Sequence, residues 1–221
     1  MAVGRQAGQG VWLREARRMF VRTVYATGDP AQLGTAVRAL NTRGHDLLEE
    51  RPGYRGAGVF VDRDLGKLLT VSWWESADAR RVSDEVMSVR RAELLQPFAG
   101  TVAVENYEAA VYHAGQRVLS GGGLRLTRFD CEPADADLAA DTFHAGVLPR
   151  LEVLPGFAGA ALFLDRERGR GMTGVLFADR ASLAATRAGQ AAIRREGTAK
   201  AHIAVIALEE FDILHADVRG D

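Results

Sequence analysis

The stretch RPGYRGAGVFVDR, from Arg51 to Arg63, recurs as LPGFAGAALFLDR, from Leu154 to Arg166. The offset is 103 residues, and the two copies align without a gap. After their first residue both copies have a proline, a glycine and an aromatic residue, and both end with an Asp-Arg pair. An internal repeat of this kind indicates that one structural unit has been duplicated.

The same offset extends the match on both sides of this stretch. Upstream, Pro30 aligns with Pro133, and downstream Gly66 aligns with Gly169. The 221 residues are therefore predicted to hold two copies of one domain, each of about 95 residues. A domain of that size buries only a modest core, so we expect the two copies to pack against each other.

Each copy has the same order of predicted elements. In the first copy, alternating or apolar runs predict four strands, at residues 20–26, 57–62, 68–74 and 101–113. Asp29-Pro30 is typical of a helix start, and Ser76 can cap a second helix. The resulting order, β-α-β-β-α-β, is that of a ferredoxin-like unit, and the second copy repeats it.

The sheet face opposite the helices also carries apolar side chains and needs cover. We therefore predict an α+β fold in which two ferredoxin-like β-α-β-β-α-β repeats pack sheet to sheet as an intramolecular dimeric α/β-barrel. The predicted boundaries are an N-terminal tail (1–18), a first repeat (19–113), a Gly-rich linker (114–123), a second repeat (124–216) and a C-terminal tail (217–221).

The composition excludes several classes of function. Hydrophobic residues make up 47% and charged residues 26%, as in ordinary soluble globular proteins. A formal net charge of -1 argues against a nucleic-acid-binding face, and no apolar run is long enough to span a membrane. The one cysteine, Cys131, excludes an internal disulfide and a thiolate cluster, and it indicates the cytoplasm. No metal-ligand spacing is present, so no metal site is expected.

Histidine is the natural acid or base near neutral pH, which makes the five histidines candidates for catalysis. His144 lies on the first helix of the second copy, beside Phe143 and near the buried stripe. We predict His144 as the catalytic residue, with a structural polar group at the helix boundary as the alternative. The other four are interpreted as structural or surface residues: His45, His113, His202 and His215.

Side-chain volume predicts where a pocket lies. The second helix of the first copy carries Val82, Val86 and Val89, which we interpret as its buried face. Smaller residues align with these valines in the second copy. Because interiors are close-packed, either the helix moves closer there or a cavity remains. We expect the ligand pocket in the second copy, and the predicted pocket residues are Phe143, Phe177, Ala185, Gly189 and Trp74.

Two motifs carry a resemblance to a known family. The Pro-Gly-aromatic turn and Trp74-Glu75-Ser76 after the third strand resemble the antibiotic biosynthesis monooxygenase (ABM) family of dimeric α/β-barrel proteins. The second copy has Phe177-Ala178-Asp179 in place of Trp-Glu-Ser. The resemblance implies a cofactor-independent monooxygenase acting on an aromatic or polyketide-like small molecule. The alternative is a non-catalytic small-molecule binding or scaffold protein on the same fold.

The haem-degrading members of the family resemble one another in a tryptophan and a haem-ligating histidine on the second helix. Val82 and about Arg91 stand at these places in the first copy, and Ala185 and about Arg194 in the second. Haem degradation is therefore disfavoured, and no cofactor is expected. The expected partner is a small molecule rather than nucleic acid or a membrane. The chain is expected to form a self-contained pseudo-dimer that is able to assemble further.

Overall fold

The structure is a computed structural model that describes residues 18–114 and 120–218. The first repeat contains β1 (Met19–Gly28), α1 (Pro30–Ala39), the π-helical turn η1 (Leu40–Gly44), α2 (His45–Glu49), β2 (Tyr54–Asp62), β3 (Lys67–Trp74), α3 (Ala77–Leu95) and β4 (Ala99–Ala114). The second repeat contains β5 (Gly123–Asp130), the 3-10 turn η2 (Pro133–Asp135), α4 (Ala136–Thr142), the π-helical turn η3 (Phe143–Val147), α5 (Leu148–Glu152), β6 (Phe157–Asp165), β7 (Arg170–Phe177), α6 (Arg180–Ala185), α7 (Arg187–Lys200) and β8 (Ala204–Val218).

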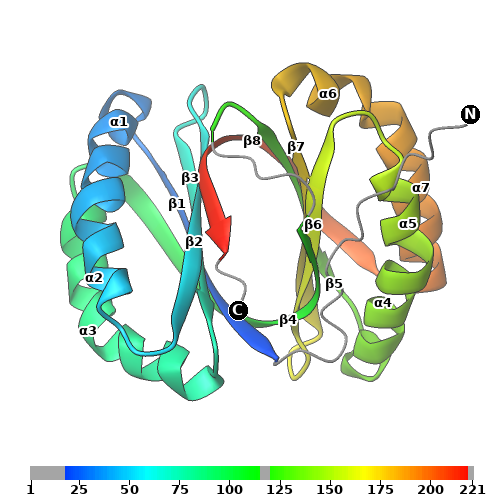
Figure 1. The fold of residues 1–221 in the computed structure, drawn as a ribbon, viewed down its shortest axis with the longest axis horizontal. Coiled ribbons are helices and arrows are strands. Elements are labelled where there is room, and N and C mark those ends of the chain that lie inside the picture. The colour runs from blue at the N-terminus through cyan, green and yellow to red at the C-terminus, as the bar shows by residue number, and fades with distance from the viewer. Residues whose placement is uncertain (1–17, 115–119, 219–221) are drawn as a thin grey trace, which may run out of the picture.

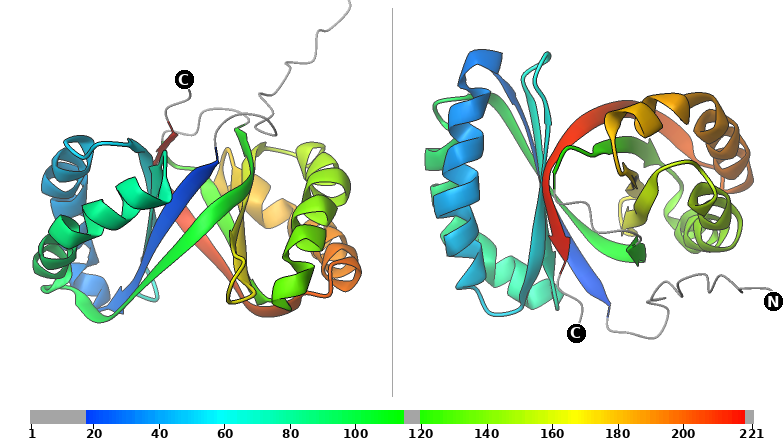
Figure 2. Two further views of the ribbon diagram at one scale, coloured as in Figure 1. Left: turned by 90° about the horizontal axis from the view of Figure 1, so that it is seen from below. Right: turned by 45° about the horizontal axis from the view of Figure 1, so that its top comes forward.

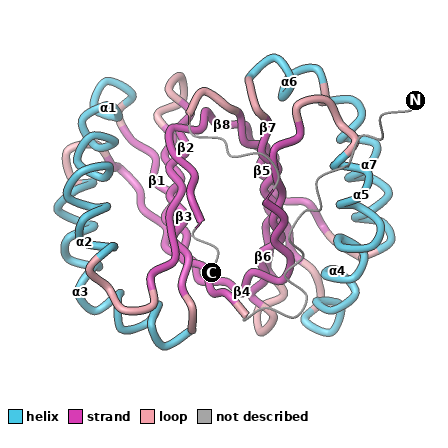
Figure 3. Tube along the Cα trace, viewed as in Figure 1, coloured by secondary structure: helices cyan, strands magenta, loops and turns pink. Residues whose placement is uncertain are grey.

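The eight strands form one closed barrel in the order β1-β3-β2-β8-β5-β7-β6-β4. Every neighbouring pair is antiparallel. Helices α1 to α3 cover the strands of the first repeat from outside, and α4 to α7 cover those of the second (Figure 1). The strands make a central ring between two outer layers of helices (Figure 3). The predicted α+β intramolecular barrel is confirmed.

The last strand of each repeat joins the two halves. Strand β4 pairs with β1 of its own repeat and with β6 of the second repeat. Strand β8 pairs with β5 of its own repeat and with β2 of the first repeat. Seen from below, the long strands cross between the two helical layers (Figure 2). This exchange closes the barrel and leaves neither half-sheet with an open edge.

The repeated Pro-Gly turn has a structural role in both halves. Gly53 and Gly156 have φ angles of +78° and +70°, a left-handed conformation that favours glycine. The Gly53 carbonyl accepts a hydrogen bond from the Glu75 amide at 2.9 Å, and the Gly156 carbonyl accepts one from the Ala178 amide at 2.8 Å. The turn therefore ties the end of the first helix to the end of the third strand.

The helix starts follow the predicted capping residues. The Asp29 carboxylate accepts from the Ala31 amide at 2.9 Å, and the Ser76 hydroxyl accepts from the Ala79 amide at 3.0 Å. These bonds satisfy amide groups that have no partner inside the helix. Together with the turns, the caps fix where α1 and α3 cross the sheet.

The core has three parts. One lies inside the barrel and includes Trp73, Tyr107 and Phe163, which come from both repeats. The other two lie between the sheet and the helices of each repeat. Trp73 points into the barrel, whereas Trp74 points to the helix side, where the Arg22 guanidinium lies 5.7 Å from its ring centroid. The two neighbouring tryptophans therefore lie on opposite faces of the sheet, as the alternation of side chains along a strand requires.

The predicted buried face of α3 is wrong. Val82, Val86 and Val89 are 50%, 46% and 62% exposed. The helix instead buries Ser83, Met87 and Leu95, a stripe rotated by about one residue. The cause is a buried arginine under the helix, Arg22, which donates to the Ser83 hydroxyl at 2.9 Å. The buried side of α3 therefore needs a polar residue, and the apolar pattern of its sequence predicts the wrong side of the helix as buried.

The four strands of the first repeat begin and end within three residues of the predicted strand ranges. Strand β4 ends at Ala114, β5 begins at Gly123 and β8 ends at Val218. Most of the predicted N-terminal tail, the centre of the linker and the last residues lie outside the described residues, at 1–17, 115–119 and 219–221. Within the described part of the chain, no helix is long and apolar enough to cross a membrane.

Candidate functional site

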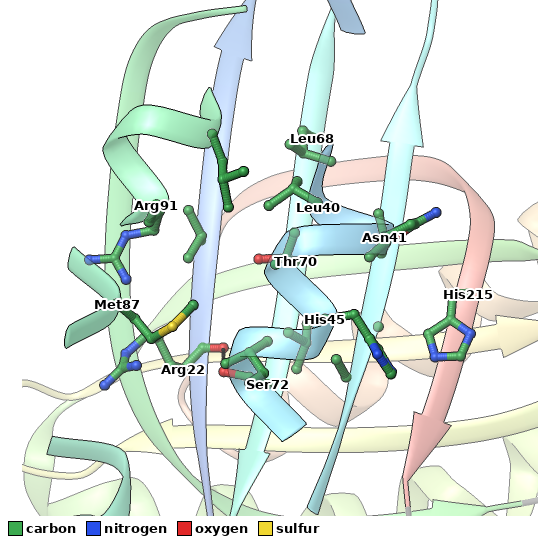
Figure 4. A pocket seen from close by; sticks show the side chains of 18 of the residues that line it. Arg22, Leu40, Asn41, His45, Leu68, Thr70, Ser72, Met87, Arg91 and His215 are labelled. Carbon is green, nitrogen blue, oxygen red and sulfur yellow. Dashed lines mark hydrogen bonds between the residues drawn. The ribbon is translucent and has the colours of Figure 1, made fainter. Parts of the chain in front are cut away.

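A cavity of about 340 Å³ lies between the helices and the sheet of the first repeat. The π-helical turn η1, helices α2 and α3 and strands β1, β2, β3 and β8 all contribute to its wall (Figure 4). The wall includes the aliphatic residues Val24, Leu40, Leu48, Val59, Leu68, Leu94, Leu95 and Leu214. Ligand pockets of about 300–1,000 Å³ with mostly apolar walls and few polar groups are typical of small-molecule sites.

Two imidazoles stand at one end of this cavity. His45 of α2 and His215 of β8 have ring centroids 6.2 Å apart, with an angle of 83° between the rings. The His45 side chain is 36% exposed, so this end reaches solvent. The carboxylates of Glu49 and Asp46 lie 3.8 and 4.0 Å from the His45 ring nitrogens, beyond hydrogen-bond distance. An imidazole here can accept a proton from a bound ligand.

Two guanidinium groups stand at the other end. Arg22, Met87 and Arg91 lie together on one side of the cavity in Figure 4, with Leu40, Leu68 and Thr70 between them and the imidazoles. Arg91 donates to the Asp84 carboxylate at 3.0 Å. Burial lowers the pKa of Arg22 to about 10, an effect that nearby Asp84 opposes, so the group stays charged at neutral pH.

The site depends on both repeats. His215 and Leu214 belong to β8, the last strand of the second repeat, which pairs with β2 of the first. In the register of this pair, Val59 lies opposite His215. The exchange of the last strand therefore brings the second imidazole to a cavity that is otherwise built from residues 22–95.

The corresponding cavity of the second repeat is only about 60 Å³. Larger apolar side chains stand at the aligned positions of the first long helix. Phe143 takes the place of Leu40, Val147 that of Gly44 and Leu148 that of His45. Phe143 and Leu148 are buried and pack in the core of the second repeat. These side chains fill the space that is open in the first repeat.

The expectation that the second repeat holds the larger space is therefore wrong. It depended on the loss of Val82, Val86 and Val89, which do not reach the core of the first repeat. Their counterparts Ala185 and Gly189 are exposed too, so their small size opens no cavity. The decisive volumes lie on the first helix of each repeat rather than on the second.

The remaining predicted site residues are spread over the molecule. Phe143 lines the small cavity of the second repeat, but His144 does not, and it is half-buried on the adjoining π-helical turn. Phe177 and Trp74 are fully buried in the cores, each under a guanidinium, at 5.6 Å from Arg125 and 5.7 Å from Arg22. The structure does not gather these residues into one site.

A further cavity of about 280 Å³ lies inside the barrel, between the repeats. Its wall is formed by aromatic and small residues, among them Trp73, Tyr112, Phe163 and Ala161. The Trp73 ring lies 4.8 Å from Tyr112 and 5.1 Å from Phe163. Burial raises the pKa of Tyr112 to about 12, and nearby Asp217 adds to this effect. The cavity between helices and sheet combines acceptor and donor groups at opposite ends, so we take it as the candidate site.

His45 and His215 are the site residues that sequence reasoning missed. Both were interpreted as surface or structural residues. The alignment of the two copies contains the signal, since His45 aligns with Leu148 and Gly44 with Val147. Where one copy has a polar residue or a glycine and the other has an apolar residue at the aligned position, the first of the two copies is the one that keeps a cavity. Among the described residues, no group of three or more His, Cys, Asp or Glu side chains could hold a metal ion.

Comparison with known proteins places the fold. A candidate monooxygenase from Lactobacillus acidophilus superimposes with a TM-score of 0.66 at 11% identity, covering 92% of this chain and 96% of the other. An anthrone oxidase-like protein superimposes with a TM-score of 0.66 at 16% identity, covering 94% and 95%. The resemblance to ABM-like proteins is therefore confirmed as a likeness of the fold, a monooxygenase-like barrel.

Sequence comparison finds relatives without an assigned role. The uncharacterized protein Rv2557 of Mycobacterium tuberculosis is 33% identical over 130 residues, which cover 59% of this chain. The match spans 58% of the length of that relative. No family model matches the chain. What the protein does must therefore be inferred from its own site.

Proposed function

We propose that the first repeat binds an aromatic or polyketide-like small molecule in the 340 Å³ cavity and oxidises it with molecular oxygen, without a bound cofactor. The observation that supports this is the pair of imidazoles, His45 and His215, at one end of an otherwise largely apolar cavity. The aliphatic wall can hold a ring system in one orientation, and the imidazoles can take a proton from a hydroxyl at its edge.

The proposed reaction begins with proton transfer. His45 or His215 accepts the proton of a phenolic hydroxyl, and the resulting anion is electron-rich at the ring carbon. That carbon reacts with oxygen, which is the oxidant and enters from solution. For a ring CH₂ group, one oxygen atom becomes the product carbonyl, and the other leaves as water with the two hydrogens of the carbon. The chain supplies orientation and the proton acceptor.

Oxygen consumption tests the proposal directly. Purified protein is mixed with phenolic ring compounds, including an anthrone, and oxygen uptake is recorded with and without each compound. His45→Gln and His215→Gln should each lower the rate, by about 100-fold for the residue that acts as the base. His144→Gln in the second repeat is the matched control and should leave the rate unchanged. Oxygen uptake that survives the double variant His45→Gln/His215→Gln would contradict the proposal.

One observation favours a binding protein without catalysis as the second candidate. A histidine base is usually oriented by a third group, but the carboxylates near His45 lie 3.8 and 4.0 Å away, too far for a hydrogen bond. On this alternative, ring compounds bind in the cavity and no oxygen is consumed. Calorimetric binding together with the oxygen measurement separates the two candidates.

Partner and location belong to the same proposal. The partner we propose is the small molecule itself, held within one chain, since both halves of the barrel are supplied by the same polypeptide. A cytoplasmic location is proposed on the single cysteine, Cys131. Labelling of the Cys131 thiol in intact and lysed cells would test the redox state that this location implies.

A further inference from the structure

Each repeat buries one arginine at the same place, on its first strand beneath its second long helix. Arg22 is 3% exposed and Arg125 is 2% exposed. They are separated by the repeat offset of 103 residues, so they descend from one position of the duplicated unit. A buried guanidinium needs hydrogen-bond acceptors and a compensating negative charge. The two repeats meet this need very differently.

Arg125 of the second repeat is fully paired. Its three nitrogens make five hydrogen bonds, which is the number of N–H groups in a guanidinium. Two go to the Glu210 carboxylate, at 3.0 and 2.8 Å. The others go to the Gln190 side chain, to the Thr186 hydroxyl and to the Leu183 carbonyl. Both charge and donors are satisfied within the repeat.

Arg22 of the first repeat keeps only two of these bonds. It donates to the Ser83 hydroxyl at 2.9 Å and to the Arg80 carbonyl, at the places of Thr186 and Leu183. The other two acceptors have changed. Met87 stands where the second repeat has Gln190. The residue opposite Arg22 on the neighbouring strand is Asn106, whereas the residue opposite Arg125 is Glu210.

The charge of Arg22 is correspondingly under-compensated. The nearest carboxylate is Asp84, 3.5 Å from the Arg22 Nε, but Asp84 is also hydrogen-bonded to Arg91 at 3.0 Å. Asp84 is 39% exposed and lies 3.5 Å from the Arg22 Nε without a hydrogen bond to it. Glu210 also pairs with a second guanidinium, that of Arg187, but it keeps two direct hydrogen bonds to Arg125. The Arg22 Nε is buried and has no hydrogen-bond partner among the described residues. Arg22, Arg91 and Met87 all line the cavity of the first repeat.

We propose that the ligand of this cavity is an anion, an aromatic carboxylate whose acid group lies toward Arg22 and Arg91 and whose ring lies toward His45 and His215. The inference rests on the proposed function only in taking this cavity as the binding site. A planar guanidinium matches a carboxylate in geometry and charge, and the pairing gains strength where water is excluded. The ligand would supply the negative charge that Glu210 supplies within the second repeat.

The test restores that internal charge. Asn106→Glu places a carboxylate opposite Arg22, and Asn106 is exposed, so the fold should not change. The probes are naphthoate and naphthamide, which share one ring system and differ in charge, with dissociation constants from calorimetry. The wild-type protein should bind naphthoate about tenfold more tightly than naphthamide. Asn106→Glu should remove most of this preference by weakening naphthoate alone.

Asn106→Gln is the matched control, because it lengthens the side chain without adding charge. Its affinities for both probes should equal those of the wild-type protein. Equal affinities for naphthoate and naphthamide in the wild-type protein, or equal naphthoate affinities in Asn106→Glu and Asn106→Gln, would overturn the inference. The inference would also be overturned if the wild-type protein bound neither naphthoate nor naphthamide, even if phenols still caused oxygen uptake. If the charge preference is found but oxygen uptake is absent, the anion site stands and the proposed oxygenase activity fails.

Discussion

The two repeats of this chain have the same elements and the same turns, yet they treat the space beneath their helices in opposite ways. The second repeat fills it with Phe143, Val147 and Leu148 and pairs its buried arginine completely. The first repeat keeps about 340 Å³ open, places histidines at one end and leaves its arginine partly unpaired at the other. The comparison teaches that duplicated halves with one fold can differ in packing: the second is a filled core, and the first keeps a cavity between its helices and sheet.

The largest expected effect is on stability and comes from the paired arginine. Arg125→Met should lower the free energy of unfolding by about 3 kcal/mol, because it removes five hydrogen bonds, two of them to the Glu210 carboxylate. Arg22→Met removes two hydrogen bonds and should lower it by about 1–2 kcal/mol. Urea denaturation measures both. Equal losses would mean that the two arginines are equally well compensated.

Copying the second repeat into the first should close the site. The double variant Leu40→Phe/Gly44→Val introduces the aligned residues of the second repeat, and a Cβ at Gly44 meets only side chains, at 3.4 Å or more. Binding of ring compounds should weaken by about 100-fold, because the added side chains occupy the space of the ligand and a bound ring would overpack the cavity. Calorimetry measures the loss. Ala185→Val, at an exposed position of the second repeat, is the control and should bind as wild type.

The two repeats should also differ in their response to acid. The hydrogen bond from Arg187 holds the pKa of Glu210 below its ordinary value, against the effect of burial, and Arg125 adds to the lowering. A lowered folded-state pKa means that the stabilisation is complete above the unfolded-state pKa of about 4.5 and is lost as pH falls through the folded-state value. As the pH is lowered below about 4.5, the urea midpoint of the wild-type protein should therefore decrease more steeply than that of Glu210→Gln. Parallel curves for the two proteins would rule out this source of stability.

The smallest effects are expected on the outer face of α3. Val82→Ala and Val86→Ala should each change the free energy of unfolding by less than about 0.5 kcal/mol, because both side chains are about half exposed. Met87→Ala, on the buried stripe of the same helix, should cost about 2 kcal/mol or more. A large loss at either valine would restore the burial pattern expected from the sequence.

Much of the fold can be predicted from the sequence because its signals are local and occur twice. Local residue types encode the Pro-Gly turn, the helix caps Asp29 and Ser76 and the four strands of each repeat. Each of these features appears in the structure. The pairing of β4 with β6 and of β8 with β2 has no local signal, since it depends on which sheet edge each last strand reaches. The closed barrel is predicted only when the apolar faces of the two duplicated sheets are considered together.

The site could not be predicted because apolar patterning is misleading where a buried charge sets the packing. Arg22 donates a hydrogen bond to Ser83 on the buried side of α3, and the valine stripe of that helix faces outward. His215 lies far from the other site residues in the chain and reaches the cavity through strand exchange. Its place on the cavity wall appears only when the register between β8 and β2 is known.

The strand exchange also bears on how such a chain can change over generations. In a dimer of identical subunits, one codon specifies both halves, so a substitution that closes one pocket closes its twin. Here the barrel is encoded as two unlike halves of a single reading frame, joined by β4 and β8. A valine at position 147 leaves the glycine at position 44 untouched. The second repeat can therefore accumulate substitutions that fill its core, while its His215 still lines the cavity of the first repeat.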